Sequence, residues 1–365
     1  MDFINLMGAT WPGGLWASLI KIFYSFITNY AWAIVVFTIC LKILLSPVDF
    51  LQRRSTAKMQ KANAKIQPEL DKLQKKYGAN PQILRQKQAE LYKKNNVNMG
   101  GSCIVMVLYL VSTLVIFMTL FNSLGVISRF KITDQYDQLK ATYYNSVEID
   151  TTDKTTTQLI EQINTLSTEQ KATAEQAVVD KYMEIKDSWL WVNNIWISDS
   201  VANRIPDFNA YLGASGTTFE VVEGGPTLEE QKTIAKTEYD AIMNKLLKEH
   251  NGPNGYYILS VLTVLVSVLT QVLTTKLMQP KQNKQTSPFG KQENTKTKPN
   301  WFMLIFLPAT MLIFTLTSSA AFSVYILFNS LISTLLIPVT MGISNAIDKK
   351  QDKKQQELTK VDYRR

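Results

Sequence analysis

The stretch PNWFMLIFLPATMLIFTLTSSAAFSVYILFNSLISTLLIPVTMGISNAI, residues 299–347, contains no charged side chain. A helix that crosses the hydrocarbon core of a bilayer needs about 20 mostly apolar residues, so this stretch is long enough for two such helices. Three more charge-free runs precede it, at residues 22–41, 95–128 and 250–275, with His250 taken as neutral. We therefore predict an all-α polytopic membrane protein with five transmembrane helices, and this distribution of charge excludes a soluble globular enzyme.

The overall composition alone does not indicate a membrane protein. The chain of 365 residues is 46% hydrophobic and has a mean hydropathy of -0.04, which is ordinary for a soluble protein. Its two cysteines, Cys40 and Cys103, lie at or inside predicted spans. They therefore cannot form a disulfide framework.

The charge-free runs divide the chain into ten segments. Residues 1–14 carry Asp2 in place of a basic region, so we expect no cleavable signal peptide. Before span 1, apolar and polar residues occupy opposite helical faces, which is typical of a helix lying at the membrane interface; a simple extension of span 1 is the alternative. The predicted segments are an outer interfacial amphipathic helix (1–28), span 1 (29–47), a cytoplasmic basic helical hairpin (48–100), span 2 (101–122), an extracytoplasmic insert (123–256), span 3 (257–278), a cytoplasmic loop (279–300), span 4 (301–319), span 5 (320–343) and a basic cytoplasmic tail (344–365).

The charges of the short loops predict the orientation. Residues 48–100 hold twelve basic and four acidic residues, residues 276–300 hold six and one, and the tail after Asn345 holds seven and four. Basic loops stay in the cytoplasm, so the N-terminus is expected outside and the C-terminus inside. The long segment 125–255 has twenty acids and twelve bases, but a loop of this length translocates whatever its charge.

The first basic loop has a helical period of apolar residues on both sides of Gly78-Ala-Asn-Pro81, which predicts a helical hairpin with a short turn. Pro68 predicts a kink or a restart in the first arm. The basic faces suit anionic lipid headgroups or ribosomal RNA, and a solvated surface is the alternative. Aromatic residues are not interleaved with the bases, so we expect no sequence-specific nucleic-acid binding. The bases singled out for recruitment are Arg53, Arg54, Lys58, Lys75 and Lys76.

Two motifs of the insert predict helix starts, Ser167-Thr-Glu-Gln170 and Thr227-Leu-Glu-Glu230. The second should open a helix that ends near Gly252-Pro253. The aromatic stretch from Trp189 to Asp199 has two interpretations. It lies in the outer headgroup belt, or it forms the core of a small outer subdomain.

The chain lacks the usual residues of catalysis. It has no HExxH, GxSxG, phosphate-binding glycine loop or cysteine cluster, and His250 is its only histidine. The spans contain no Asp or Glu at depth, which removes the common carriers of proton or cation coupling. We therefore expect no enzyme activity, no metal and no cofactor.

Lys42 is the one basic residue inside a span, seven residues before Asp49. Thr38 and Ser46 lie one turn away on the same face, and spans 3 and 5 carry polar stripes of their own, which include Ser267 and Gln271 in one and Tyr325, Asn329 and Ser333 in the other. A snorkelling Lys and stripes that hold helices together are the simpler interpretation. Converging stripes around a cation without a carboxylate partner favour a hydrated cavity within the membrane.

The sequence resembles the YidC, Oxa and Albino membrane protein insertases, as a Gram-positive-type YidC with an enlarged outer loop. The resemblance covers five spans and the hairpin, roughly 230 residues, in the family's order. Lys42 stands where the family has a groove Arg, which keeps the charge but loses the planar fork of that side chain. The residues that carry the resemblance are the run Tyr30–Pro47, Gln52, Met59-Gln60, Ile66-Gln-Pro68-Glu69, Lys76-Tyr77, Leu91-Tyr92-Lys93-Lys94, Asn96-Val97-Asn98, Gly101-Ser-Cys103, Leu190-Trp191, Val324-Tyr325 and Asn329.

The resemblance implies a multi-pass protein of the bacterial plasma membrane that inserts nascent membrane proteins, alone or with the Sec translocon. It implies a hydrophilic groove open to cytoplasm and lipid, and a hairpin and tail that recruit ribosomes or a targeting factor receptor and contact anionic lipids. A small-solute or ion pore lined by the same stripes is the alternative function. The predicted groove residues are Thr38, Lys42, Ser46, Ser267, Gln271, Tyr325 and Asn329.

Overall fold

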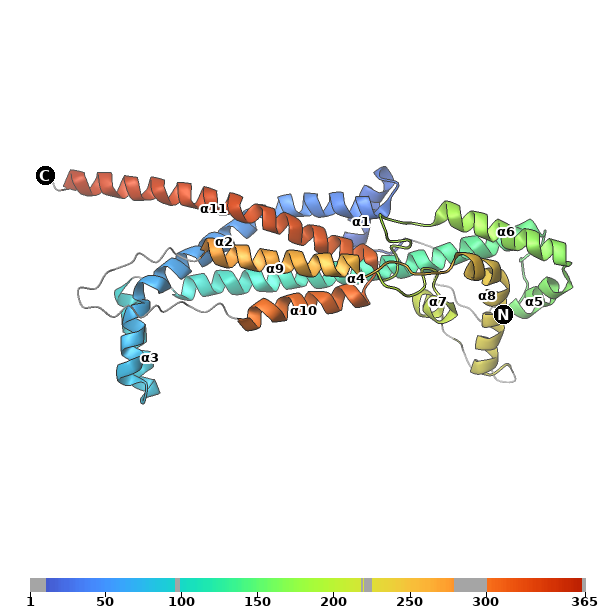
Figure 1. Cartoon of the computed structure of the whole chain (residues 1–365), viewed down its shortest axis with the longest axis horizontal. Coiled ribbons are helices and arrows are strands. Elements are labelled where there is room, and N and C mark those ends of the chain that lie inside the picture. The colour runs from blue at the N-terminus through green and yellow to red at the C-terminus, as the bar shows by residue number, and fades with distance from the viewer. Residues whose placement is uncertain (1–10, 96–98, 218, 220–224, 279–300, 363–365) are drawn as a thin grey trace. The chain divides into compact units, whose positions relative to one another are not determined.

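The computed structural model describes residues 11–95, 99–217, 219, 225–278 and 301–362, and their regular structure is helical (Figure 1). The predicted all-α fold is confirmed, whereas residues 1–10 and the predicted loop 279–300 lie outside the described residues. The helices are α1 (Leu15–Phe26), α2 (Tyr30–Tyr77), α3 (Pro81–Lys94), α4 (Met99–Ser146), α5 (Thr156–Thr165), α6 (Thr168–Ile185), α7 (Phe208–Ser215), α8 (Leu228–His250), α9 (Ile258–Met278), α10 (Trp301–Thr317) and α11 (Ala320–Asp362).

The chain forms two compact units. Unit one comprises Met1–Phe37, Thr119–Thr263 and Thr310–Leu327, and unit two comprises Thr38–Met118, Val264–Ala309 and Phe328–Arg365. Helices α2, α4, α9, α10 and α11 contribute residues to both units. The predicted insert belongs to unit one, and the predicted hairpin and tail belong to unit two.

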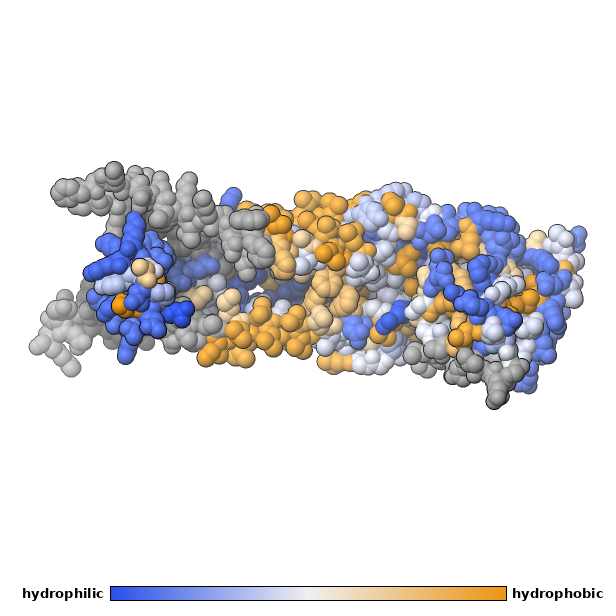
Figure 2. Space-filling model, turned by 90° about the horizontal axis from the view of Figure 1, so that it is seen from below, coloured by the Kyte–Doolittle hydropathy of each residue, from blue (hydrophilic) through white to orange (hydrophobic). Residues whose placement is uncertain are grey.

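In the part of the chain that the structure describes, four helices are long and apolar enough to cross a membrane, namely Tyr30–Tyr77, Met106–Ser146, Ile258–Leu277 and Ala320–Gln351. Within the described side chains of α10, the apolar segment Pro308–Thr317 is shorter, so five spans stay a prediction. Figure 2 shows an extensive hydrophobic surface, coloured orange. Large exposed apolar patches on soluble monomers are rare, so this surface indicates contact with lipid. Exposed apolar side chains include Ile43, Leu44, Leu108, Leu114, Leu265, Ile313 and Leu335.

Helix α1 is separate from α2. Its cap residue Ile27 has extended backbone angles, so the alternative of one continuous helix is wrong. Ala17 and Ile20 are buried, and the Trp16 indole N–H donates to the Thr119 hydroxyl at 2.9 Å. The opposite end of the apolar face is exposed at Phe26. Helix α1 is thus fixed to α4 by a side-chain hydrogen bond and keeps an apolar edge outward.

Helix α2 continues through both of its prolines, although the sequence predicts a kink or restart at Pro68. A proline cannot donate to the carbonyl four residues earlier. At Pro47 that carbonyl belongs to Ile43, and the Ser46 hydroxyl donates to it at 2.8 Å. Pro68 and the residue four positions before it, Ala64, are both exposed, so water can reach the freed carbonyl. The helix therefore does not restart at Pro68.

A short turn separates α2 from α3 at the predicted position. The Asn80 side chain accepts a hydrogen bond from the Ile83 N–H at 3.3 Å, and Pro81 occupies the first turn of α3. Both residues are typical of helix N-termini. The Asn side chain accepts a hydrogen bond from a free backbone N–H, and Pro has no backbone N–H that would need a partner. Local sequence therefore determines where the second arm begins.

The insert is a helical subdomain built on the continuation of α4. Helix α4 runs 48 residues without a break into the insert, where α5, α6, α7 and α8 share its core. Both predicted capping boxes are present, at Ser167 and Thr227, and Thr155 forms a third. The core is rich in tyrosine and consists of Tyr136, Leu139, Tyr143, Tyr144, Leu159, Ile163, Ala174, Val178, Val179, Tyr182, Ile205, Phe208, Tyr211, Ala235, Tyr239, Ile242, Met243 and Leu246.

A buried ion pair lies at one side of this core. The Glu238 carboxylate is 3.0 Å from the Lys140 ammonium and accepts a hydrogen bond from the Tyr144 hydroxyl at 2.5 Å. Only 2% of the Glu238 side chain is exposed. Burial and this carboxylate raise the pKa of Tyr144. The contact joins α4 to α8.

The aromatic stretch that begins at Trp189 has a third role that the sequence does not predict. Trp196 is buried against the Tyr30 ring at 4.4 Å, and neither Trp189 nor Trp196 belongs to the core of the insert. Asp199 accepts hydrogen bonds from the backbone N–H groups of Tyr256 and Leu259 at 3.0 and 2.7 Å. These groups lie at the start of α9, where a carboxylate is stabilised by free N–H donors and the helix dipole.

Two backbone carbonyls of the same loop accept hydrogen bonds from the first N–H groups of α11. Ala320 donates to Ile197 at 2.7 Å and Ala321 donates to Ile195 at 2.9 Å. Gly255 packs so closely on Asp199 that an added Cβ would lie 1.8 Å from the carboxylate oxygen. The loop therefore caps two membrane-type helices, and it explains why a glycine precedes α9.

Candidate functional site

The strongest candidate site in unit two is built on Lys42, on the α2 face that the sequence singles out. Its ammonium lies 3.5 Å from a carboxylate oxygen of Asp49, two turns further along the same helix. The other oxygen of Asp49 accepts a hydrogen bond from the Tyr109 hydroxyl of α4 at 2.9 Å. The two charged side chains are only 13% and 9% exposed. The three residues thus form one connected polar cluster, the Lys42 cluster.

This cluster corrects the expectation that Lys42 has no carboxylate partner. From sequence, Asp49 is the first charged residue after Lys42. Seven residues are about two helical turns, so both side chains lie on the same face of α2. The Lys42 side chain is long enough to reach the Asp49 carboxylate. Asp49 as a residue is 6% exposed. The cation is paired within its own helix.

Thr38 and Ser46, the polar neighbours of Lys42, differ in their surroundings. Thr38 is fully buried. Ser46 is half-buried and its hydroxyl is bonded to the Ile43 carbonyl that Pro47 leaves without a donor. Ser46 therefore has a structural role in α2, and its hydroxyl is already occupied.

The polar stripe of α9 faces inward. Ser260 and Thr263 are fully buried and Ser267 is 7% exposed, whereas Leu265 and Leu269 on the opposite side are 59% and 49% exposed. Soluble proteins show the reverse pattern. An apolar exterior with polar residues inside suits a helix that has lipid on one side and polar groups on the other.

In unit two the stripes of α9 and α11 meet through one hydrogen bond between the hydroxyls of Thr270 and Thr334. The Thr270 hydroxyl donates to the Val266 carbonyl of its own helix, so it accepts in the contact with Thr334. Gln271, one residue on, has a buried side-chain amide nitrogen that finds no hydrogen-bond partner among the described residues. Buried donors without partners are uncommon and mark places where water or a ligand can bind. Among the described residues of the stripe, Gln271 in unit two and Ser260 in unit one therefore each have free hydrogen-bonding capacity.

The predicted span-5 residues fall in different units. Asn329 is half-buried in unit two, where its carbonyl accepts from the Ser333 hydroxyl at 2.7 Å. Tyr325 belongs to unit one, is 5% exposed and packs its ring 6.1 Å from that of Phe322. Six of the seven predicted groove residues thus lie in unit two, and Tyr325 does not.

The predicted recruitment bases have two kinds of surroundings. Arg53 donates to the Ser333 carbonyl at 3.3 Å, and Arg54 donates to Asp348 at 3.2 Å, so both face α11. Lys58, Lys75 and Lys76 are exposed, and we call them the exposed hairpin lysines. Arginines that hold helices together are poorly available to a partner, whereas the three lysines present positive charge at the surface.

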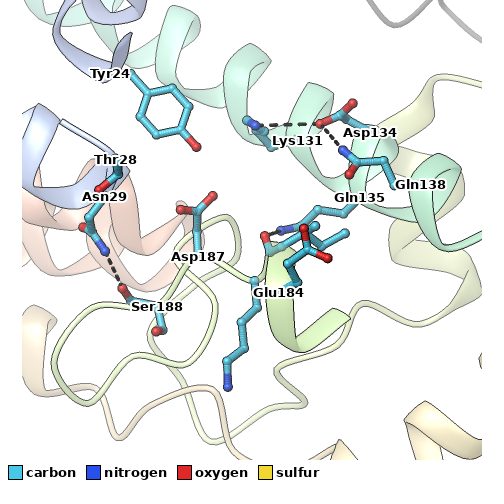
Figure 3. Close-up of a pocket in the computed structure, with 12 residues that line it drawn as sticks. Tyr24, Thr28, Asn29, Lys131, Asp134, Gln135, Gln138, Glu184, Asp187 and Ser188 are labelled. Carbon is cyan, nitrogen blue, oxygen red and sulfur yellow. Dashed lines mark hydrogen bonds and ion pairs between the residues drawn. The ribbon is translucent and has the colours of Figure 1, made fainter. Parts of the chain in front are cut away.

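A polar pocket of about 420 Å³ lies in unit one, between the end of α1, α4 and the end of α6 (Figure 3). The Tyr24 hydroxyl and the Asp187 carboxylate point toward one another across it. Burial raises the pKa of Asp187 to about 6, against the opposing effect of the Lys131 ammonium. Burial and the same carboxylate raise the pKa of Tyr24 to about 12. The pocket therefore holds a carboxyl group that titrates near pH 6.

Comparison with known proteins bears on this arrangement of apolar helices around inward polar residues. Residues 22–201 match the family model of the 60Kd inner membrane protein. This match includes α2, the Lys42 cluster, α3 and α4. The resemblance predicted from sequence is confirmed, and the chain is a multi-pass protein of the bacterial membrane.

Curated relatives that carry the name membrane protein insertase YidC are similar to parts of this chain. The Leptospira interrogans protein is 39% identical over 105 residues, 28% of this chain and 16% of the relative. The Clostridium tetani protein is 41% identical over 92 residues, which are 24% of this chain and 40% of the relative. The Caldanaerobacter subterraneus protein is 37% identical over 93 residues, which are 26% of this chain and 43% of the relative. The chain thus spans less than half the length of each of these relatives.

Sequence reasoning misses three residues that the structure brings into polar sites. Asp49 has a usable signal, because it stands on the helical face of Lys42. Tyr109 has no such signal, because it lies 60 residues after Asp49 and on a different helix. Asp199 has none either, since the groups that it caps are 57 and 60 residues away.

Proposed function

We propose that this protein inserts nascent membrane proteins into the bacterial membrane and helps them to fold, without catalysing a chemical reaction. The observation that carries the proposal is the paired but shielded cation Lys42 on a helix whose outward side chains are apolar. The match to the 60Kd inner membrane protein family over residues 22–201 supports it. Relatives named YidC insertase support it too.

In the proposed mechanism, a hydrophobic segment with a short polar flank enters from the cytoplasm. Lys42, Thr38 and the free donor of Gln271 solvate the flank and lower the free energy of taking it out of water. Partition of the hydrophobic segment into lipid then drives release. The groove that this requires opens to cytoplasm and lipid and includes the polar faces of α2, α9 and α11.

The finer architecture is part of the same proposal. Five spans place the N-terminus outside, the hairpin and tail in the cytoplasm, and residues 123–256 outside the cell. The exposed hairpin lysines and the basic tail recruit ribosomes, a targeting factor receptor or the Sec translocon, and anionic lipids hold this surface to the membrane. Their excess of positive charge supports the assignment.

The deciding experiment measures insertion of a small single-span substrate with an acidic outer tail into vesicles that contain the purified protein. Lys42→Arg should retain insertion, because the charge is kept, and Lys42→Ala should impair it. Lys276→Ala, at an exposed position near the end of α9, removes the same charge elsewhere and should have no effect. Equal insertion by wild type and Lys42→Ala would contradict the proposed role of the cation.

A parallel flux measurement separates insertion from the alternative function. Vesicles with the same protein are loaded with a small ion or solute, and release is followed without substrate. The proposal expects insertion without substrate-independent release, whereas a pore lined by the same polar residues would release the solute.

A further inference from the structure

The geometry of the Lys42 cluster leaves the ammonium incompletely paired. Charged hydrogen bonds of N–H donors to carboxylates are typically about 2.7–2.9 Å long. The Lys42–Asp49 distance is 3.5 Å, and the ammonium has three donors. Asp49 divides its two oxygens between partners, because Tyr109 donates to Oδ1 while Lys42 faces Oδ2. A second carboxylate can therefore approach Lys42.

Neither the Lys42 ammonium nor the Asp49 carboxylate is stable without a partner in these mostly buried surroundings. A mostly buried ammonium or carboxylate that loses its partner pays a large desolvation penalty. Lys42 therefore keeps Asp49 until another anion is present. Arg53 lies one turn after Asp49 on α2, the spacing at which side chains on a helix meet, so a displaced Asp49 has a second cation within reach.

We infer that Asp49 is an internal counter-ion of Lys42, which an acidic side chain in the polar flank of a substrate displaces. Asp49 then determines which flanks are accepted, because only a carboxylate can take its place on the cation. Tyr109 is a positioning residue, which holds the Asp49 carboxylate toward Lys42. This inference rests on the proposed function, since it requires that substrate flanks reach Lys42.

The inference predicts a change in preference between substrates. Insertion is compared for two matched substrates whose outer tails carry two Asp or two Asn residues. Asp49→Asn removes the competing charge and should raise the ratio of acidic to neutral insertion rates about threefold. Asp49→Glu keeps the charge and should leave the ratio at the wild-type value. Tyr109→Phe should move the ratio in the direction of Asp49→Asn.

A second readout does not depend on the insertion rate. A carbodiimide joins an amine to a carboxylate only when the two groups touch. In the resting full-length protein in vesicles it should join Lys42 to Asp49. Addition of the acidic-tail substrate, held by a folded domain fused to its end, should lower this product and give one between Lys42 and the substrate. Mass spectrometry of the digested protein identifies both.

The outcomes distinguish the inference from the proposed function. If Lys42→Ala lowers acidic-tail insertion while Asp49→Asn leaves the substrate ratio and the Lys42 crosslink to substrate unchanged, the counter-ion role is refuted and the function stands. If Lys42→Ala also has no effect on either substrate, both are refuted. Loss of the Asp49→Asn effect in the double variant Lys42→Ala with Asp49→Asn would show that the residue acts through the cation.

Discussion

Replacing Tyr144 by Phe should loosen α8 without removing any apolar contact from the core of the insert. The Tyr144 hydroxyl donates to Glu238, whose side chain is 2% exposed and also pairs with the Lys140 ammonium. The substitution leaves that carboxylate oxygen buried without this donor. The ring itself stays in place, so the lost interaction is confined to one hydrogen bond.

The size of the effect follows from the charge of the acceptor. A hydrogen bond to a charged group contributes about 1.5–3 kcal/mol, roughly twice a neutral one. Since every 1.4 kcal/mol is a factor of ten, opening of α8 should become about 10- to 100-fold more frequent. Unfolding of a region is reported by exchange of its protected amide hydrogens.

Hydrogen exchange of the full-length protein in lipid nanodiscs, followed by mass spectrometry, measures this change. Peptides from the buried part of α8, around Ile242 and Leu246, should exchange faster in the variant. The matched control is Tyr143→Phe, one residue earlier in α4, since the Tyr143 ring is buried but its hydroxyl makes no hydrogen bond to a described residue. Equal protection of α8 in wild type and Tyr144→Phe would refute the reasoning that the buried carboxylate depends on this donor.

Three further predictions concern the surface, the stripe and the pocket. Replacing the exposed hairpin lysines by Gln should weaken ribosome binding in a cosedimentation assay while membrane integration is unchanged; undiminished binding would contradict recruitment by this surface. In a background without the two native cysteines, Gln271→Cys should react with a charged thiol reagent and Leu269→Cys should not, and silence at both would argue against a hydrated groove. The raised pKa of Asp187, about 6 against an ordinary 3.8, means that its contribution to stability is present below about pH 4 and is lost as the pH rises through 6. Asp187→Asn should therefore be more stable than wild type above pH 6 and lose this pH dependence, measured by thermal unfolding in detergent; an unchanged profile would contradict the assignment.

Sequence reasoning predicts those features that depend on neighbouring residues. The capping boxes at Ser167 and Thr227 form because each hydroxyl needs only the N–H three residues later. The start of α3 at Pro81 follows from the same kind of local chemistry. The apolar helices follow from runs without charge, which need no knowledge of tertiary contacts.

The errors arise where a side chain bonds to a backbone group that lacks its usual partner, or where it contacts a helix that is distant in sequence. The predicted restart at Pro68 is absent because water can reach the freed carbonyl, while a kink there stays a prediction. At Pro47 the Ser46 hydroxyl donates to the corresponding carbonyl. The partner of Lys42 is on the same helix and could be predicted from spacing. Tyr109 and Asp199 could not, because their contacts depend on the fold.

The hydroxyls of α9 have a consequence for how this protein itself reaches the membrane. Thr263, Thr270, Thr274 and Thr275 each donate to the carbonyl four residues earlier in their own helix. The acceptor of each hydroxyl lies in the same helix, so the helix can move from water into lipid before it packs against another helix. We therefore expect α9 to enter the bilayer with these four hydroxyls already bonded, so that among its described buried side-chain groups only the Ser260 hydroxyl and the Gln271 amide still need partners. A hydroxyl bonded in this way can still accept a hydrogen bond from a neighbouring helix, as Thr270 does from Thr334 while it donates to Val266.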